Sequence, residues 1–160
     1  MARLSILNSA VGELFTEVFR GTPPGADGTW FVQGNEALDA TLDSLTAEQA
    51  SKAFGPGVST IAAHVIHTAY YLELANASLR GEERDADWSG SWRVQSLDEP
   101  GWTEAKENLA SQKEQFLEFV GSVELADNEE RLTYVLANLG HVAYHLGAIR
   151  QLFGGLKVKG

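Results

Sequence analysis

Residues 127–153 read DNEERLTYVLANLGHVAYHLGAIRQLF, and this stretch decides the fold of the 160-residue chain. Apolar side chains recur along it every three or four residues, and Asp127 or Asn128 can cap its start. Such spacing predicts one amphipathic α-helix that ends at Phe153, before Gly154-Gly155. Its apolar stripe consists of Val135, Leu139, Val142, Leu146 and Phe153.

The rest of the chain predicts more helices and no β-strand. Two short helical segments are expected: one over residues 35–44, and a further helical turn that the capping box Thr46-Ala-Glu-Gln49 opens and Phe54-Gly-Pro-Gly57 ends. Ser59 is the expected N-cap of a long helix that follows. The long helices are predicted over residues 3–20, 60–80 and 102–121.

These elements predict an all-α fold. Four long helices form a four-helix bundle, and the extra short helices lie in its first long connection. At this length, residues 1–160 are expected to form a single domain with one core.

Composition limits the classes of partner. A formal net charge of −10, with the twelve Lys and Arg residues scattered, argues against nucleic-acid binding. No apolar run is long enough to cross a membrane, and the N-terminus lacks the pattern of a secretory signal. We therefore expect a cytoplasmic protein. The chain has no cysteine, so a metal site would need nitrogen and oxygen ligands.

All four histidines lie in two short windows of the sequence. His141 and His145 are four residues apart in the last predicted helix, so their imidazoles lie on one face. Two imidazoles on one face form half of a divalent metal site. A single buried histidine is more often hydrogen-bonded than metal-bound, so the other two histidines matter to the argument.

The third ligand is expected from the 60–80 helix. His64 lies about 60° from the apolar stripe of that helix and His67 about 120° from it. His64 is therefore the better ligand candidate, whereas His67 is expected to point toward solvent or an adjoining loop. His67 remains an alternative ligand or a hydrogen-bonding neighbour of the site. The other candidate neighbours are Asn138, Tyr71 and Tyr134.

Two segments resemble a known family. The segment from Pro56 to His67 (PGVSTIAAHVIH) and the segment HVAYHLGAIR that starts at His141 are similar to the DinB-like superfamily, in which a helix-borne His precedes an HxxxHxGxI pattern. That superfamily includes YfiT-like metal-dependent hydrolases and bacterial thiol S-transferases. The resemblance implies a DinB/YfiT-type bundle in which His64, His141 and His145 bind a divalent metal, nickel or zinc.

The resemblance also leaves several functions open. It implies a metal-dependent hydrolase or a thiol S-transferase acting on a small molecule such as a low-molecular-weight thiol, with no catalytic residue identified. The alternative is a non-catalytic bundle that binds metal or a small ligand. Pairing into a homodimer is compatible with either function.

A loop from Glu82 to Gly101 carries tryptophans whose role the sequence leaves open. Trp88 and Trp92 lie within it, and Trp102 follows directly. These rings could roof the histidine site or cover an apolar edge of the bundle. We expect plain packing, because aromatic side chains bury large areas wherever they lie.

Overall fold

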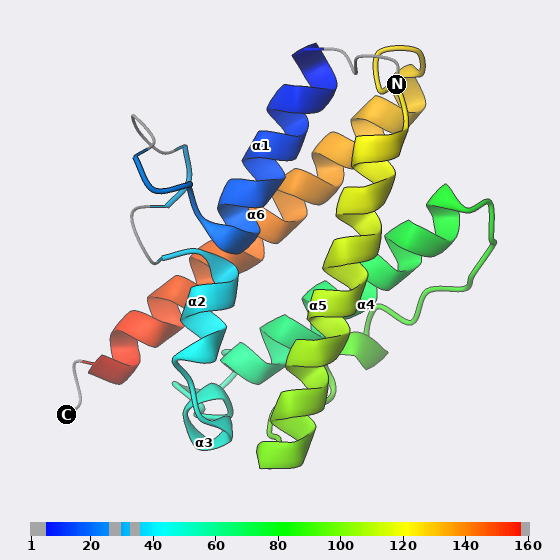
Figure 1. The fold of residues 1–160 in the computed structure, drawn as a ribbon. Coiled ribbons are helices and arrows are strands. Elements are labelled where there is room, and N and C mark those ends of the chain that lie inside the picture. Colours follow the sequence, from blue (N-terminus) through cyan, green and yellow to red (C-terminus); the bar gives the residue numbers. More distant parts are fainter. Residues whose placement is uncertain (1–5, 26–29, 33–35, 158–160) are drawn as a thin grey trace.

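The computed structural model describes residues 6–25, 30–32 and 36–157, and these residues form helices and no strand. The parts of the predicted 3–20 and 35–44 helices at residues 3–5 and 35 lie outside the described residues. The helices, shown in Figure 1, are α1 (Ile6–Arg20), α2 (Leu38–Asp43), α3 (Ala47–Ala50), α4 (Ile61–Leu79), the 3₁₀ turn η1 (Gly90–Trp92), α5 (Glu99–Ser122) and α6 (Glu129–Lys157).

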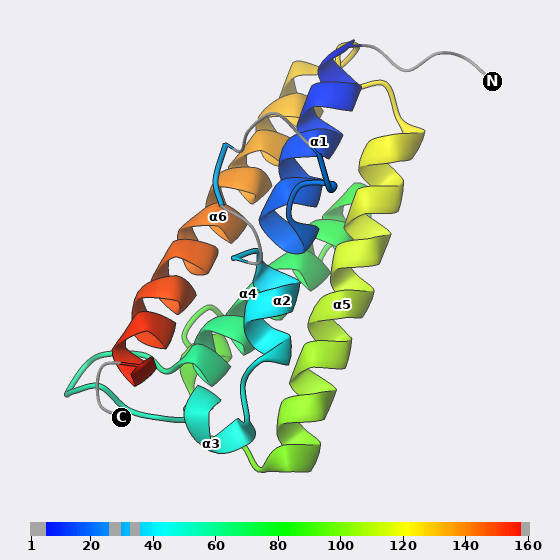
Figure 2. The same ribbon diagram turned by 60° about the vertical axis from the view of Figure 1, so that its left-hand side comes forward.

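The four long helices α1, α4, α5 and α6 form the bundle predicted from the sequence. α4 packs on both α5 and α6, and α1 also contacts both of these helices. Figures 1 and 2 show α1, α5 and α6 alongside one another, with α4 behind them in both views. Phe15 of α1 and Phe116 of α5 meet in the core with ring centroids 5.1 Å apart.

The extra short helices lie in the connection from α1 to α4, as expected. α3 begins with the predicted capping box: the Thr46 hydroxyl accepts from the Gln49 N–H, and the Gln49 side chain accepts from the Thr46 N–H. α2 and α3 are each anchored by a buried side chain, since Leu38 of α2 and Ala50 of α3 have no exposed surface. This connection therefore belongs to the folded core.

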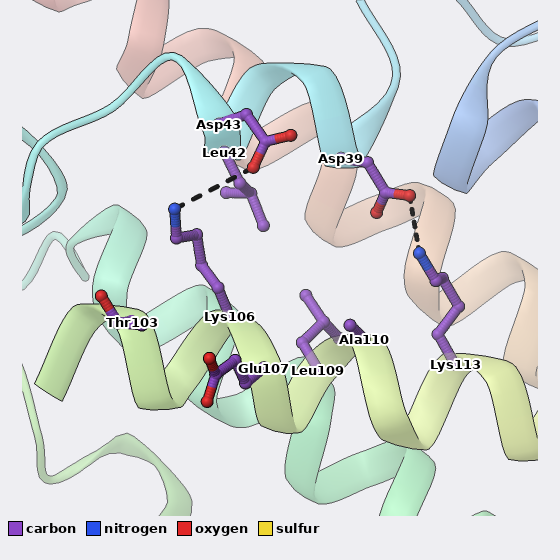
Figure 3. Close-up of a pocket in the computed structure, with 9 residues that line it drawn as sticks. All are labelled: Asp39, Leu42, Asp43, Thr103, Lys106, Glu107, Leu109, Ala110 and Lys113. Carbon is purple, nitrogen blue, oxygen red and sulfur yellow. Dashed lines mark hydrogen bonds and ion pairs between the residues drawn. The ribbon is translucent and has the colours of Figure 1, made fainter. Parts of the chain in front are cut away.

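Charged side chains join α2 to α5 (Figure 3). The buried Lys113 ammonium donates to Asp39 at 2.6 Å, and Lys106 lies 3.9 Å from Asp43 at the other end of a pocket of about 390 Å³. Leu42 and Leu109 line the pocket between the two pairs. Because Lys113 is buried, its charge needs a nearby carboxylate; Asp39 is the closer of two, and Glu114 lies 3.6 Å away.

A buried carboxylate also holds the first connection against α1. Glu17 Oε1 accepts hydrogen bonds from the backbone N–H groups of Trp30, Phe31 and Val32 at 2.6–3.1 Å. These N–H groups would otherwise lack partners in a loop that has no secondary structure of its own. Glu17 therefore fixes the path by which the chain leaves α1.

Three helix ends differ from the prediction. Thr60 caps α4 in place of Ser59, because its hydroxyl accepts from the Ala63 N–H. α5 begins at Glu99 behind the cap Asp98, since Pro100 fits the first turn of a helix. α6 continues through Gly154-Gly155 to Lys157.

Gly155 lies in close contact with a side chain of the connection between α1 and α4. A Cβ atom at this position would lie 2.7 Å from the Phe54 ring. The glycine therefore serves packing against Phe54 and does not end α6. No helix among the described residues is long and apolar enough to cross a lipid bilayer.

Candidate metal centre

The structure brings all four histidines together between α4 and α6. The closest group is His67, His141 and His145, whose candidate ligand nitrogens all lie within 4.8 Å of one another. Their ring centroids are 4.5–5.3 Å apart. The pairing of His141 with His145 on one helix face, expected from their spacing, is therefore part of a compact group of three imidazoles.

His64 lies beside this group. Its Nδ1 atom is 2.9 Å from Nδ1 of His145, a hydrogen bond in which one ring donates and the other accepts. Its ring thus touches His145, whereas His67 completes the group around His141 and His145. The assignment of the third ligand to His64 stays a prediction, and the geometry favours His67, the alternative ligand considered from the sequence.

His67 faces the adjoining loop, as its position on the helix predicts, but it is not exposed. Only 5% of its surface is accessible, because residues of the α4–α5 connection cover it. α4 is buried on most of its sides, because buried residues such as Ala62, His64 and Thr68 point in different directions around the helix. A single apolar stripe is therefore a poor guide to which side chains of α4 face the interior.

The loop between α4 and α5, which carries Trp88 and Trp92, covers the histidines. The Trp92 ring stacks on His67 with centroids 4.1 Å apart and meets His64 edge-on at 5.2 Å. Ser91, which the sequence did not single out, lies 2.8 Å from Nδ1 of His67 through its hydroxyl oxygen. No local pattern in the sequence signals this bond, because it depends on how a long loop folds back over α4.

The three tryptophans of this region have different roles. Trp92 covers the site, so the expectation of plain packing is wrong for this residue. Trp88 packs against Tyr70 and Tyr71, with centroids 6.0 and 5.8 Å away. Trp102 is a core residue of α5 whose indole N–H donates to the Leu45 carbonyl.

Of the three residues predicted to neighbour the site, Tyr71 contacts a histidine directly. Tyr71 stacks on His141 at 3.6 Å with nearly parallel rings. Asn138 donates to the Tyr134 carbonyl, and its Oδ1 atom is buried with no hydrogen-bond partner. Tyr134 shares with Tyr71 a pocket of about 420 Å³. Tyr71 is therefore the candidate neighbour in direct contact with the histidine group.

Burial keeps the imidazoles neutral. It lowers the pKa of His145 to about 3 and that of His67 to about 4, with neighbouring histidines adding to the effect in both. Burial also lowers the pKa of His64 and of His141. Neutral imidazoles have a free lone pair, which is the form that binds a metal ion.

The residues present fit a divalent metal ion. His141 Nε2 is buried and has no hydrogen-bond partner, which is costly unless another group binds it. Three neutral imidazole nitrogens form a ligand set suited to zinc or nickel. The group contains histidine alone, so an ion there would have further positions for other ligands.

A pocket shares Tyr71 with the histidine group, although no histidine lines it. It lies beside α4 and the start of the α4–α5 connection, and Tyr71 contributes both to its wall and to the stack on His141. Burial, followed by the nearby Tyr134, raises the pKa of the Tyr71 hydroxyl. The pocket is lined by Tyr71, Leu74, Ser78, Glu82, Glu83, Arg84, Ala86, Trp88 and Tyr134.

Comparison with known proteins agrees with the resemblance read from the sequence. The family model described as the DinB superfamily matches residues 31–149, a range that includes all four histidines. No curated protein and no solved structure matches the chain. The family match covers most of the chain, and the fold is an all-helical bundle of the expected kind. The chain belongs to the DinB superfamily.

Proposed function

We propose that this protein binds one divalent metal ion through His67, His141 and His145 and uses it to act on a small molecule. The observation that carries the proposal is the compact group of three imidazoles. In one of them, His141, the Nε2 atom is buried and has no hydrogen-bond partner. In this assignment His64 holds the His145 ring through their hydrogen bond. A hydrogen bond to a ligand's second nitrogen fixes its orientation.

The bound metal would supply Lewis acidity to a water molecule or a substrate thiolate. Hydrolysis and transfer of a low-molecular-weight thiol are therefore the two reaction types that the site accommodates. Trp92 shields one side of the histidine group from water, because its ring covers His67. Exclusion of water strengthens electrostatic interactions inside such a site.

In this proposal, the substrate binds in the pocket beside Tyr71. Its aromatic walls, Tyr71, Trp88 and Tyr134, suit an organic molecule with an apolar part. The Tyr71 hydroxyl is protonated at neutral pH, and burial raises its pKa further, so it can donate a hydrogen bond to a bound substrate. Arg84 adds a cation at the rim, although it is paired with Glu73 and Glu82.

The first test is the metal content of protein purified without an affinity tag. We expect close to one nickel or zinc ion per chain in the unaltered protein and a loss of most of it in His141→Ala and His145→Ala. Gln151→Ala is the matched control, because Gln151 lies in the same helix, six residues beyond His145, and is exposed. Unchanged metal content in both histidine variants would disprove the site.

Measuring turnover distinguishes a thiol transferase from a hydrolase. Metal-loaded protein is assayed with low-molecular-weight thiols plus electrophiles and, separately, with ester and amide substrates. Activity in the first panel that disappears in His141→Ala identifies a thiol transferase, and activity in the second identifies a hydrolase. Stoichiometric metal binding with no turnover in either panel supports the alternative, a bundle that binds metal without catalysing a reaction.

A further inference from the structure

Ser91 is a buried polar side chain in the loop between α4 and α5, with 8% of its surface exposed. Its hydroxyl oxygen makes two short contacts. It lies 2.8 Å from Nδ1 of His67, and the hydroxyl donates to the Trp88 carbonyl at 2.7 Å. Together these two contacts determine on which atoms the protons of Ser91 and His67 lie.

The Ser91 hydroxyl has one proton and can therefore donate one hydrogen bond. The Trp88 carbonyl oxygen can only accept, so it takes this proton. In the contact with His67, the hydroxyl oxygen therefore accepts and Nδ1 of the imidazole donates. The opposite direction would leave the oxygens of Ser91 and Trp88 2.7 Å apart with no proton between them, which is a repulsive contact.

This proton arrangement identifies the nitrogen of each ring that can bind an ion. A neutral imidazole has one N–H and one free lone pair, so a proton on Nδ1 of His67 leaves the lone pair on Nε2. Nδ1 of His145 is occupied by its 2.9 Å hydrogen bond with His64. In His141, Nε2 is the buried atom that has no hydrogen-bond partner. Nε2 is therefore the nitrogen left for an ion in all three rings.

We propose that Ser91 is a positioning residue of the metal centre. It holds the proton of His67 on Nδ1 and so leaves Nε2 of that ring to the ion. This inference rests on the proposed function, because it takes His67 as a ligand, and it adds that all three histidines bind through Nε2. A hydrogen bond from the second nitrogen of a ligand imidazole fixes the ring orientation and raises the basicity of the ligand atom.

The turn that carries Ser91 is held by its own hydrogen bonds. The Ser91 N–H donates to the Asp87 carbonyl at 3.2 Å, and Asp87 Oδ1 accepts from the Gly90 N–H at 2.8 Å. A side chain at Gly90 would overlap the Asp87 carboxylate. The turn over residues 87–91 therefore depends on a carboxylate and a glycine that place the serine.

The loop is also fastened to α4 on both sides of Ser91. Before it, the Asp87 N–H donates to the Tyr70 hydroxyl at 2.8 Å. After it, Gln95 Oε1 accepts from the N–H of Thr60, the N-cap of α4, at 3.0 Å. Both anchors belong to the helix that carries the imidazole, so the serine hydroxyl is held in register with that ring.

Nitrogen-15 NMR of the histidine side chains in metal-free protein measures the proton position. We expect His67 to carry its proton on Nδ1 in the wild type. Ser91→Ala removes the acceptor, so a form with the proton on Nε2 should appear. Ser91→Thr retains a hydroxyl and should retain the wild-type form. A wild-type His67 with its proton on Nε2 would overturn the proposal, whether or not the protein binds metal.

Titration of the metal-free variants with zinc measures the effect on the ion. We expect Ser91→Ala to weaken zinc binding by about 10- to 100-fold, and Ser91→Thr to restore most of it. Ser89→Ala is the matched control, because Ser89 is an exposed serine of the same turn whose hydroxyl donates to Asp87. It should bind zinc like the wild type. Circular dichroism should show all variants folded.

Gln95→Ala distinguishes a loosened loop from a lost acceptor. It removes one anchor of the loop but leaves the Ser91 hydroxyl in place, so it should keep the proton of His67 on Nδ1 and weaken zinc binding less than Ser91→Ala does. Equal losses in the two variants would overturn the proposal, and so would an unchanged affinity in Ser91→Ala. A wild-type protein that has the expected proton position but binds no metal would overturn the proposed function, and only the direction of the hydrogen bond would then stand.

Discussion

At the scale of single residues, the open choice is between His64 and His67 as the third imidazole. His67 belongs to the group whose ligand nitrogens lie within 4.8 Å, and His64 touches only one member of it through a hydrogen bond. Both side chains come from α4, one turn apart. Their separate substitution therefore decides the ligand set without disturbing any other helix.

We expect His67→Ala to lose metal more severely than His64→Ala. Removing a ligand deletes a bond to the ion, whereas removing a hydrogen-bonding neighbour typically weakens metal affinity by about 10- to 100-fold. Titration of each metal-free variant with nickel and with zinc measures the difference. If His64→Ala abolishes binding while His67→Ala retains it, the ligand assignment made from the sequence is correct and the proposed one is wrong.

At the scale of helices, the start of α4 depends on Thr60. Its hydroxyl accepts from the Ala63 N–H and donates to the Gln95 carbonyl, so it both caps α4 and ties the loop to it. Thr60→Ala should lower the free energy of unfolding by about 1–2 kcal/mol. Ser59→Ala, the neighbouring control, should change it by less than about 0.5 kcal/mol. Urea denaturation compares the two, and equal effects would contradict the assignment of the cap.

The attachment of α2 to α5 gives a second matched pair. Asp39→Ala leaves the buried Lys113 ammonium without its 2.6 Å partner and should cost about 1–3 kcal/mol of stability. Asp43→Ala removes a carboxylate that is 79% exposed and 3.9 Å from Lys106, and should cost less than about 1 kcal/mol. Thermal unfolding of both variants measures this difference. A cost for Asp43→Ala as large as for Asp39→Ala would contradict it.

The helices were predictable from the sequence because their periodicity and caps are local. The capping box at Thr46 and the two short helices appear as expected, and so does the placement of His141 and His145 side by side on one helix face. The end of α6 was not predictable, since Gly155 is required by the Phe54 ring from a distant loop. The role of His67 depends on the fold of the α4–α5 connection, which no periodicity encodes.

At the scale of the whole molecule, neutral buried histidines make the metal-free protein sensitive to acid. The pKa values of His67 and His145 fall from 6.5 to about 4 and about 3 on folding. The unfolded chain therefore takes up protons below pH 6.5 that the folded chain does not. The resulting stability is complete above that pH and is lost as the pH falls toward about 4.

We expect the metal-free protein to lose about 1–3 kcal/mol of stability between about pH 6.5 and about pH 5.5, since one pKa unit corresponds to about 1.4 kcal/mol. Urea denaturation at a series of pH values in the presence of a chelator measures the loss. His145→Gln, which removes one of the two groups, should flatten the dependence. A stability that stays constant across this range would show that the histidines are not held neutral.

The stacking of Trp92 on His67 gives the site an optical reporter. Among the tryptophans of the described residues, this ring is the one in contact with a candidate ligand, at 4.1 Å between centroids. Nickel(II) has an open d shell and quenches indole fluorescence at short range, whereas zinc(II), with a filled shell, does not quench in this way. The intrinsic emission of the protein should therefore dim when nickel binds and change much less with zinc. The protein thus signals, without any label, which metal it holds.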